Sequence, residues 1–170
     1  MSAPDAACGG FLVTALVFQA SAVVIGGRAL LIEGAPGSGK SSLALALIDR
    51  GAGLIGDDAV TLTADGDRLV ASAPPNIAGL LEVRGVGLVR VPLAPPAPVA
   101  LILRLGTAAR ERLPETPLPT RIIAGIAVPV LPFDPGPIAP AQRAEWAFAM
   151  HGRVFAPSSL SQPPAPHKAS

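Results

Sequence analysis

Residues 29–50 read ALLIEGAPGSGKSSLALALIDR, and this stretch decides the fold. An apolar run typical of a buried strand leads into a glycine-rich segment, and an uninterrupted helical pattern follows. The spacing Gly34-x4-Gly39-Lys40-Ser41 is the phosphate-binding P-loop pattern. Glycines let such a loop turn tightly, so that backbone N–H groups at a helix N-terminus bind phosphate oxygens. The alternative is a glycine-rich turn that binds nothing.

Lys40 and Ser41 carry the chemistry of this pattern. The lysine bridges the β- and γ-phosphates, and the serine hydroxyl ligates Mg²⁺. The only other lysine is Lys168, near the C-terminus, whereas arginines number 11, and a guanidinium does not replace a compact ammonium group. The predicted nucleotide-binding residues are Gly34, Ala35, Pro36, Gly37, Ser38, Gly39, Lys40 and Ser41.

Composition limits the class of protein. The chain has 170 residues, 50% of them hydrophobic and 15% charged, which predicts a single domain over residues 1–155. The remaining residues, 156–170, form a Pro-rich tail that we expect to be disordered. A net charge of +1 gives no electrostatic basis for nucleic-acid binding. A single cysteine, Cys8, excludes an intramolecular disulfide framework and a cysteine zinc site.

The N-terminal region resembles a signal peptide or membrane span because residues 6–27 carry no charge. However, no Lys or Arg precedes it, and Gln19 and Ser21 interrupt it. Gly26-Gly27 is typical of a turn between two apolar runs. We therefore predict strands joined by a hairpin, and no membrane insertion.

The remaining pattern predicts an α/β fold, a P-loop kinase domain with a mixed, strand-rich sheet. The expected strands are 11–18, 21–25, 28–33, 53–55, 60–63, 68–72 and 99–105, and the expected helices are 41–50 and 139–150. Asp65-Gly66 predicts a hairpin. Prolines predict irregular chain at 94–98, at 113–119 and in the loop before the last helix.

Asp57 and Asp58 follow an apolar segment just past the P-loop helix. A metal-bound triphosphate needs a nearby carboxylate, and two adjacent carboxylates repel each other unless a cation or proton separates them. The pair therefore suggests one role beside Mg²⁺ and one as general base. The alternative is a solvated turn after a strand.

The segment LEVRGVG at 81–87 places Glu82 and Arg84 two residues apart. In an extended chain that spacing puts both side chains on one face, and the glycines permit close approach of a ligand. Taken alone, an exposed Glu–Arg pair beside a glycine-rich bend is an equally good interpretation.

The three segments GAPGSGKS, LIGDDAV and LLEVRGVG, in this order, resemble the catalytic domain of bacterial HPr kinase/phosphorylase. The resemblance runs over residues 17–115 and ends with ERLPE at 111–115. Long family members carry a further N-terminal domain, and this chain is similar to the short, catalytic-domain-only form of alphaproteobacteria.

The resemblance implies an ATP-dependent serine kinase, with phosphorylase activity in reverse, that acts on an HPr-like phosphocarrier protein. It implies ATP, or pyrophosphate in some members, and Mg²⁺ held by Ser41 and Glu82. Asp58 matches the family's proton acceptor, which donates the proton in reverse; Asp57 supports the metal side. Arg84 lies in the segment tied to both reactions. A cytoplasmic location and a hexameric homo-oligomer are also implied.

Two departures from the family pattern stand out. Gln19 occupies the position of the family's catalytic histidine, and an amide can neither titrate nor carry charge. The family's late arginine loop is not recognisable, and Arg143 is its only candidate; His151 falls too late and fits a helix end. Both departures weigh against the phosphorylase direction.

Two other functions remain as alternatives. One is a nucleotide-binding regulatory module that signals through a protein partner. The other is a small-molecule kinase, although the Arg-rich lid segment typical of such kinases is missing after the P-loop helix.

Overall fold

A computed structural model describes residues 14–76, 79–106 and 112–156. The predicted strand 11–18 therefore lies partly outside the described residues, and so does the predicted tail beyond residue 156. The elements are β1 (Ala15–Phe18), β2 (Ser21–Ile25), β3 (Arg28–Glu33), α1 (Lys40–Asp49), β4 (Gly53–Gly56), β5 (Val60–Asp65), β6 (Arg68–Ser72), β7 (Leu80–Val83), β8 (Gly87–Arg90), β9 (Ala97–Leu105), β10 (Thr120–Ile123), β11 (Ile126–Phe133) and α2 (Pro140–His151).

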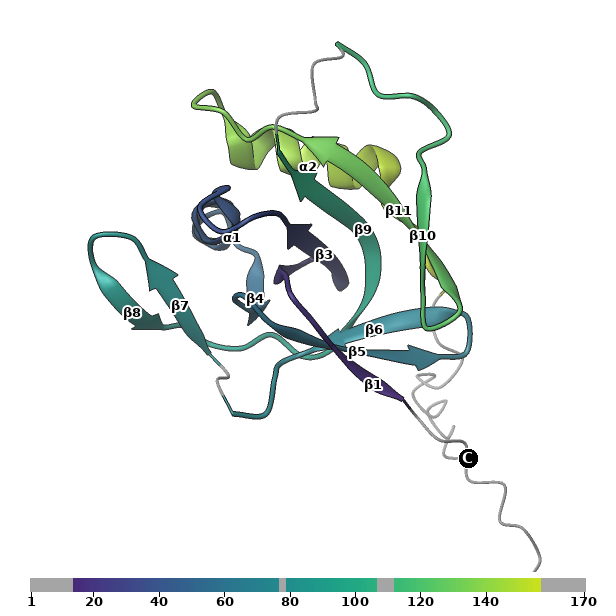
Figure 1. The fold of residues 1–170 in the computed structure, drawn as a ribbon, viewed down its shortest axis with the longest axis horizontal. Coiled ribbons are helices and arrows are strands. Elements are labelled where there is room, and N and C mark those ends of the chain that lie inside the picture. Colours follow the sequence, from purple (N-terminus) through teal and green to yellow (C-terminus); the bar gives the residue numbers. More distant parts are fainter. Residues whose placement is uncertain (1–13, 77–78, 107–111, 157–170) are drawn as a thin grey trace, which may run out of the picture.

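Within these residues, nine strands form one mixed sheet in which β9 is the branching strand (Figure 1). The main order is β1-β5-β6-β9-β3-β2-β4. Along one side β9 pairs in parallel with β3; along the other its start pairs with β6 and its end pairs in parallel with β11. The carboxyl ends of β3, β9 and β11 therefore meet at one edge of the sheet. The expected α/β fold with a mixed, strand-rich sheet is confirmed.

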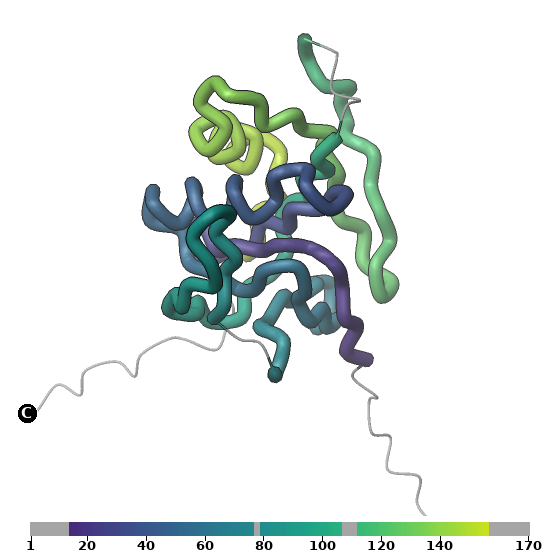
Figure 2. Tube along the Cα trace, turned by 60° about the vertical axis from the view of Figure 1, so that its left-hand side comes forward, coloured from purple at the N-terminus to yellow at the C-terminus, as the bar shows by residue number. Residues whose placement is uncertain are grey.

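The core has a cluster on each face of the central strands. Alternate residues of β3 point to opposite faces, so Leu30 packs with Leu47 of α1 and Phe148 of α2, whereas Leu31 packs with Leu62 of β5. This explains why β3 is an unbroken apolar run rather than an alternating one. Figures 1 and 2 show α1 and α2 next to each other, and they are in contact.

Local turn signals predicted the hairpins correctly. Gly26 and Gly27 both have positive φ, 57° and 79°, as the tight two-residue turn between β2 and β3 requires. The Asp65-Gly66 turn joins β5 to β6 as expected. Helix α1 begins and ends one residue earlier than predicted.

The hairpin of β10 and β11 is a correction, because the sequence predicted a proline-rich loop before the last helix, which was expected to begin at residue 139. Pro129 and Pro132 lie inside β11. Residues 126–129 pair only with β10, and residues 130–133 pair only with β9. Each half of the strand thus has one unpaired side, where a missing proline N–H costs little. The expectation for another proline is also wrong. Strand β9 begins at Ala97, inside the segment 94–98 that was expected to be irregular, and Pro98 pairs with β6.

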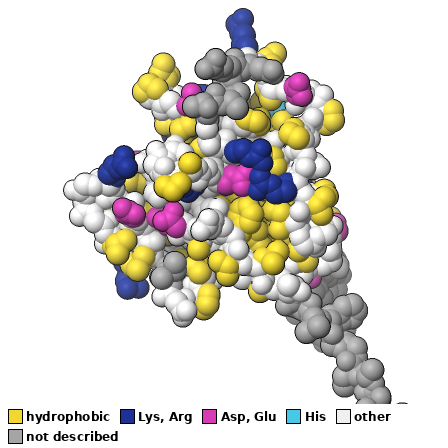
Figure 3. Space-filling model, viewed as in Figure 1, with side chains coloured by type: hydrophobic (Ala, Val, Ile, Leu, Met, Phe, Trp, Pro, Cys, Tyr) yellow, Lys and Arg dark blue, Asp and Glu magenta, His cyan; other side chains and the backbone are white. Residues whose placement is uncertain are grey.

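The surface is sparsely charged. Figure 3 shows basic and acidic side chains in small groups of both signs, scattered among hydrophobic ones on the face that it presents. No helix in the described part of the chain is long and apolar enough to cross a membrane.

An ion-pair cluster lies directly before the P-loop. Glu33, the last residue of β3, accepts hydrogen bonds from Arg121 of β10 at 2.6 Å to each oxygen and from Arg104 of β9 at 2.9 Å. Burial by itself would raise the pKa of Glu33, but the two guanidinium groups outweigh it and lower that pKa below its ordinary value. The cluster joins the β10–β11 hairpin to the start of the phosphate-binding loop.

We expect Glu33→Gln to lower the free energy of unfolding by about 1–3 kcal/mol at pH 7, because Arg121 loses its partner. Since the pKa of Glu33 is lowered on folding, its contribution is complete at neutral pH and is lost as the pH falls below the ordinary 4.5. Urea unfolding at pH 7 and at about pH 3 measures this, and the difference between the two proteins should shrink in acid. Glu145→Gln, which breaks an exposed pair with Arg50, is the control and should change little. A pH-independent loss in Glu33→Gln contradicts the ion-pair explanation.

Candidate active site

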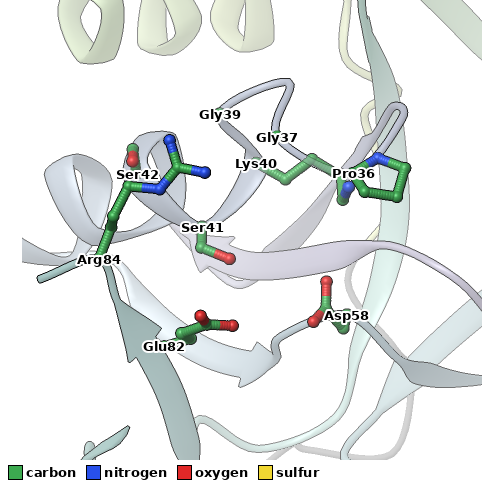
Figure 4. Close-up of a pocket in the computed structure, with 9 residues that line it drawn as sticks. All are labelled: Pro36, Gly37, Gly39, Lys40, Ser41, Ser42, Asp58, Glu82 and Arg84. Atoms are coloured by element: carbon green, nitrogen blue, oxygen red, sulfur yellow. The ribbon is translucent and has the colours of Figure 1, made fainter. Parts of the chain in front are cut away.

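A pocket of about 240 Å³ opens at the P-loop (Figure 4). Its lining comes from three segments far apart in sequence: the P-loop with the start of α1, the turn after β4, and the β7–β8 hairpin. The lining residues are Pro36, Gly37, Gly39, Lys40, Ser41, Ser42, Asp58, Glu82 and Arg84. The structure thus brings together the three motifs that the sequence singled out.

Two glycines of the loop are required by its geometry. A Cβ on Gly34 would lie 2.6 Å from the Ser38 hydroxyl and 3.1 Å from the carbonyl oxygen of Leu105 at the end of β9. Gly39, the residue before α1, has a φ of 99°, a backbone conformation that residues other than glycine rarely adopt. The loop is therefore packed against β9 on one side and turns sharply into the helix on the other.

The N-terminus of α1 is open toward the pocket. No side chain caps it, and its first turn holds no acidic residue, so its N–H groups and partial positive charge face a potential anion. The Lys40 ammonium donates to the carbonyl oxygens of Gly34 at 2.8 Å and Ala35 at 3.2 Å, both within the loop. This region combines a cation with backbone donors, as phosphate binding requires.

Asp57 does not line the pocket; it lies beneath it, 9% exposed. Its Oδ1 accepts hydrogen bonds from the hydroxyls of Ser41 and Ser21, each at 2.7 Å. Its Oδ2 accepts one from the backbone N–H of Glu82 at 3.1 Å. The carboxylate therefore connects the start of α1, strand β2 and strand β7. Sequence analysis assigned no role to Ser21, since a lone hydroxyl in an apolar strand does not reveal its partner.

Asp58 lies in a different environment from its neighbour. Its side chain is exposed to the pocket, and its backbone has a φ of 63°. This left-handed conformation is uncommon outside glycine and occurs more often at functional sites. Figure 4 shows the side chains of Ser41, Asp58 and Glu82 facing a common space. The adjacent aspartates are thus separated into one buried and one accessible carboxylate.

Glu82 and Arg84 reach the pocket by a route that the sequence did not predict. The chain does not stay extended: Val86 donates its N–H to the carbonyl oxygen of Val83 at 3.0 Å, and Gly85 has a φ of 78°. Arg84 therefore lies in the turn of the β7–β8 hairpin rather than on one strand face with Glu82. This hairpin pairs with no other strand among the described residues and stands apart from the main sheet in Figure 1.

The donor set suits a magnesium nucleotide. In the described part of the chain no three His, Cys, Asp or Glu side chains gather as a metal cluster. A cation here would instead draw on the Ser41 hydroxyl, the Glu82 carboxylate and oxygens of a bound phosphate, which are the hard ligands that Mg²⁺ prefers. The open helix end and Lys40 would hold that phosphate.

The two departures noted in the sequence lie outside the pocket lining. Gln19 is exposed at the corner between β1 and β2. Arg143 donates to the carbonyl oxygens of Asp134 and Pro135 and stacks on the Phe133 ring at 4.9 Å. Together with His151, the last residue of α2, it lines a second cavity of about 440 Å³ between α2 and residues 112–119.

Comparison with known proteins agrees with this geometry. The family model of the HPr serine kinase C-terminal domain matches residues 12–94. The HPr kinase/phosphorylase of Clostridium tetani is 47% identical over 66 residues, and that of an Exiguobacterium species is 49% identical over 70. The structure of the Hpr(Ser) kinase/phosphatase from Coxiella burnetii superposes with a TM-score of 0.70 at 31% identity, covering 80% of this chain and 95% of that one. The chain belongs to the HPr serine kinase C-terminal domain family.

The alignments with the curated relatives cover only part of each protein. The Clostridium and Exiguobacterium alignments cover 39% and 41% of this chain and 22% of each relative, so the chain spans less than a quarter of these curated relatives. The family match contains the P-loop, the aspartate pair and residues 81–87, but it ends before ERLPE at 111–115, of which Glu111 lies outside the described residues. The individual roles of the pocket residues stay predictions.

We expect Lys40→Ala to weaken binding of MgATP by about 10- to 100-fold, because a hydrogen bond to a charged group contributes about 1.5–3 kcal/mol. The glycines of the loop remain, so the thermal unfolding midpoint should change little. Isothermal titration calorimetry measures the affinity. Arg50→Ala, which removes an exposed cation just beyond the other end of α1, is the matched control. Unchanged affinity in Lys40→Ala rules out the P-loop assignment.

Proposed function

We propose that this protein is an ATP-dependent serine kinase that acts on an HPr-like phosphocarrier protein. The observation that carries the proposal is the meeting of the P-loop with Asp58, Glu82 and Arg84 in one pocket, in a chain of this family. The bound magnesium nucleotide supplies the phosphoryl group and neutralises its charge. Phosphoryl transfer needs positioning and electrostatic stabilisation rather than covalent help from the protein.

Each pocket residue has a role in this proposal. Lys40 and the N–H groups of α1 bind the phosphates, while Ser41 and Glu82 hold Mg²⁺. Asp57 supports the metal side from beneath the pocket and does not ligate the cation itself, because both of its oxygens already accept hydrogen bonds. Arg84 faces the pocket with a fixed positive charge that stabilises the transferring group.

Asp58 is the general base of the proposed reaction. It is the accessible carboxylate of the pair, so it can take the proton from an incoming serine hydroxyl as the oxygen attacks the phosphorus. A protein substrate is compatible with this position, since the pocket is open and the β7–β8 hairpin beside it is exposed. In the reverse direction the same carboxyl group would return the proton.

Kinase activity is the favoured direction. Gln19 can donate a hydrogen bond to phosphate but carries no charge, and Arg143 is engaged with carbonyl oxygens beside the second cavity. The proposal includes a cytoplasmic location, which agrees with the use of ATP. It also includes a hexameric assembly, which the family resemblance implies. A regulatory module that binds nucleotide and a partner without catalysis is the competing function.

The deciding experiment incubates the purified protein with γ-labelled ATP and the phosphocarrier protein encoded in the same genome. The expected product is phosphoserine on the carrier, detected by mass spectrometry. ATP binding and carrier binding without phosphoserine would instead establish the regulatory module. A parallel reaction with labelled pyrophosphate identifies the phosphoryl donor.

Asp58→Asn should lower the rate of phosphorylation by about 10²- to 10⁴-fold, the usual effect of losing a general base. ATP affinity should persist, because the phosphate contacts lie in the P-loop. Single-turnover kinetics with a saturating carrier measure the rate, and Asp67→Asn in the exposed β5–β6 turn is the control. A full rate in Asp58→Asn would rule out Asp58 as the general base.

Gln19→His should increase removal of phosphate from the phosphorylated carrier in the presence of inorganic phosphate, and should affect the kinase rate less. A charge-assisted hydrogen bond from a histidine is about twice as strong as a neutral one from an amide. Following phosphoserine loss at several phosphate concentrations tests this. If the unaltered protein already dephosphorylates as fast as it phosphorylates, glutamine is a sufficient replacement and the inferred direction is wrong.

A further inference from the structure

Ser21 is a fully buried hydroxyl in a strand that is otherwise apolar. It is the first residue of β2, it is 0% exposed, and it is absent from the pocket lining. Burying a hydroxyl costs free energy unless it is hydrogen-bonded, and an apolar residue would fill this position more easily. The single side-chain partner found among the described residues is Asp57, at 2.7 Å and 36 residues along the chain.

The oxygen that Ser21 contacts is the same oxygen that Ser41 contacts. Both hydroxyls donate to Oδ1 of Asp57, so the proton of Ser41 is directed down toward the carboxylate. The lone pairs of the Ser41 oxygen are then left to face the pocket, which is the orientation that a cation ligand needs. The backbone N–H of Glu82 holds the other oxygen of Asp57.

Without Ser21, one donor would remain on each oxygen of Asp57. The carboxylate is 9% exposed, so water has little access to replace the lost bond. Rotation of the carboxylate about its terminal torsion would then be less restricted, and the direction of the Ser41 hydroxyl would be less well fixed.

We infer that Ser21 is a positioning residue for the metal side of the site: it fixes Asp57, and through Asp57 the Ser41 hydroxyl, in the orientation that ligates the divalent cation. The inference rests on the proposed function, because it takes the cation of a bound nucleotide as the ligand. Ser21 touches neither substrate nor metal and acts only through Asp57.

The test uses two variants of equal shape, Ser21→Thr and Ser21→Val, which differ in the hydroxyl alone. Both variants place the same extra bulk at a buried position, so the cost of overpacking should be shared, and only Ser21→Val also loses the hydrogen bond to Asp57. Titration of Mn²⁺ into the protein with ATP, followed by electron paramagnetic resonance, measures cation affinity directly. Mutation of a residue that hydrogen-bonds to a metal ligand typically lowers metal affinity by 10- to 100-fold. We expect binding about 10-fold weaker in Ser21→Val than in Ser21→Thr, and unchanged ATP affinity in both when metal is chelated.

Ser72→Ala is the matched control, because Ser72 is a strand serine whose hydroxyl donates only a long 3.5 Å bond to the Thr61 carbonyl oxygen. It should leave Mn²⁺ affinity unchanged. Equal Mn²⁺ affinity in the Thr and Val variants overturns the inference and leaves the proposed function standing. Absence of any nucleotide-dependent cation binding in the unaltered protein overturns both together.

Discussion

The carboxylate of Asp57 is bonded to three segments, of which only β2 is also joined by sheet pairing to β4, the strand that precedes Asp57. Its donors come from β2, from the first turn of α1 and from β7. A buried carboxylate without a cation is costly unless its lone pairs are satisfied, and here three donors satisfy them. The consequence is greatest for the β7–β8 hairpin, which belongs to a separate two-stranded sheet. The bond from the Glu82 N–H is therefore one of the contacts that place the Glu82 side chain opposite the P-loop.

A second constraint acts on the other side of the P-loop. The loop follows β3, and Gly34 packs against the end of β9, while a Cβ on Gly39 would lie 3.9 Å from Pro135, just past the end of β11. The three parallel strands thus end together around the loop, as expected for a ligand site in an open α/β sheet. Glu33 strengthens this arrangement, because Arg104 and Arg121 attach the last residue of β3 to β9 and β10. The geometry of the P-loop is in this way supported by the strands that lie on the β9 side of β3.

The parts that sequence predicted well depend on neighbouring residues. Gly26-Gly27, Asp65-Gly66 and the P-loop spacing are local signals, and the elements around them appear where they were expected. Prediction failed where a distant partner decides the outcome. Pro129 and Pro132 argue against a strand until β9 and β10 are known to pair with different halves of it. The partners of Ser21 and Glu33 lie 36 and 88 residues away, so no spacing rule could have indicated them.

The aspartate pair shows how local backbone and distant contacts combine. Two adjacent carboxylates in one environment would repel each other and compete for the same cation. The positive φ of Asp58 turns the chain between them, so Asp57 meets its three donors below the loop while Asp58 enters the pocket. A non-glycine residue in that conformation costs on the order of 1 kcal/mol or more, and it persists only where the surroundings determine it. Asp58 is held from both sides. The hydrogen bonds of Asp57 hold the residue before it, and the chain enters strand β5 two residues after it, at Val60. The strain is therefore the consequence of placing neighbouring carboxylates in separate environments: Asp57 is bonded to three donors beneath the loop, and Asp58 remains accessible from the pocket.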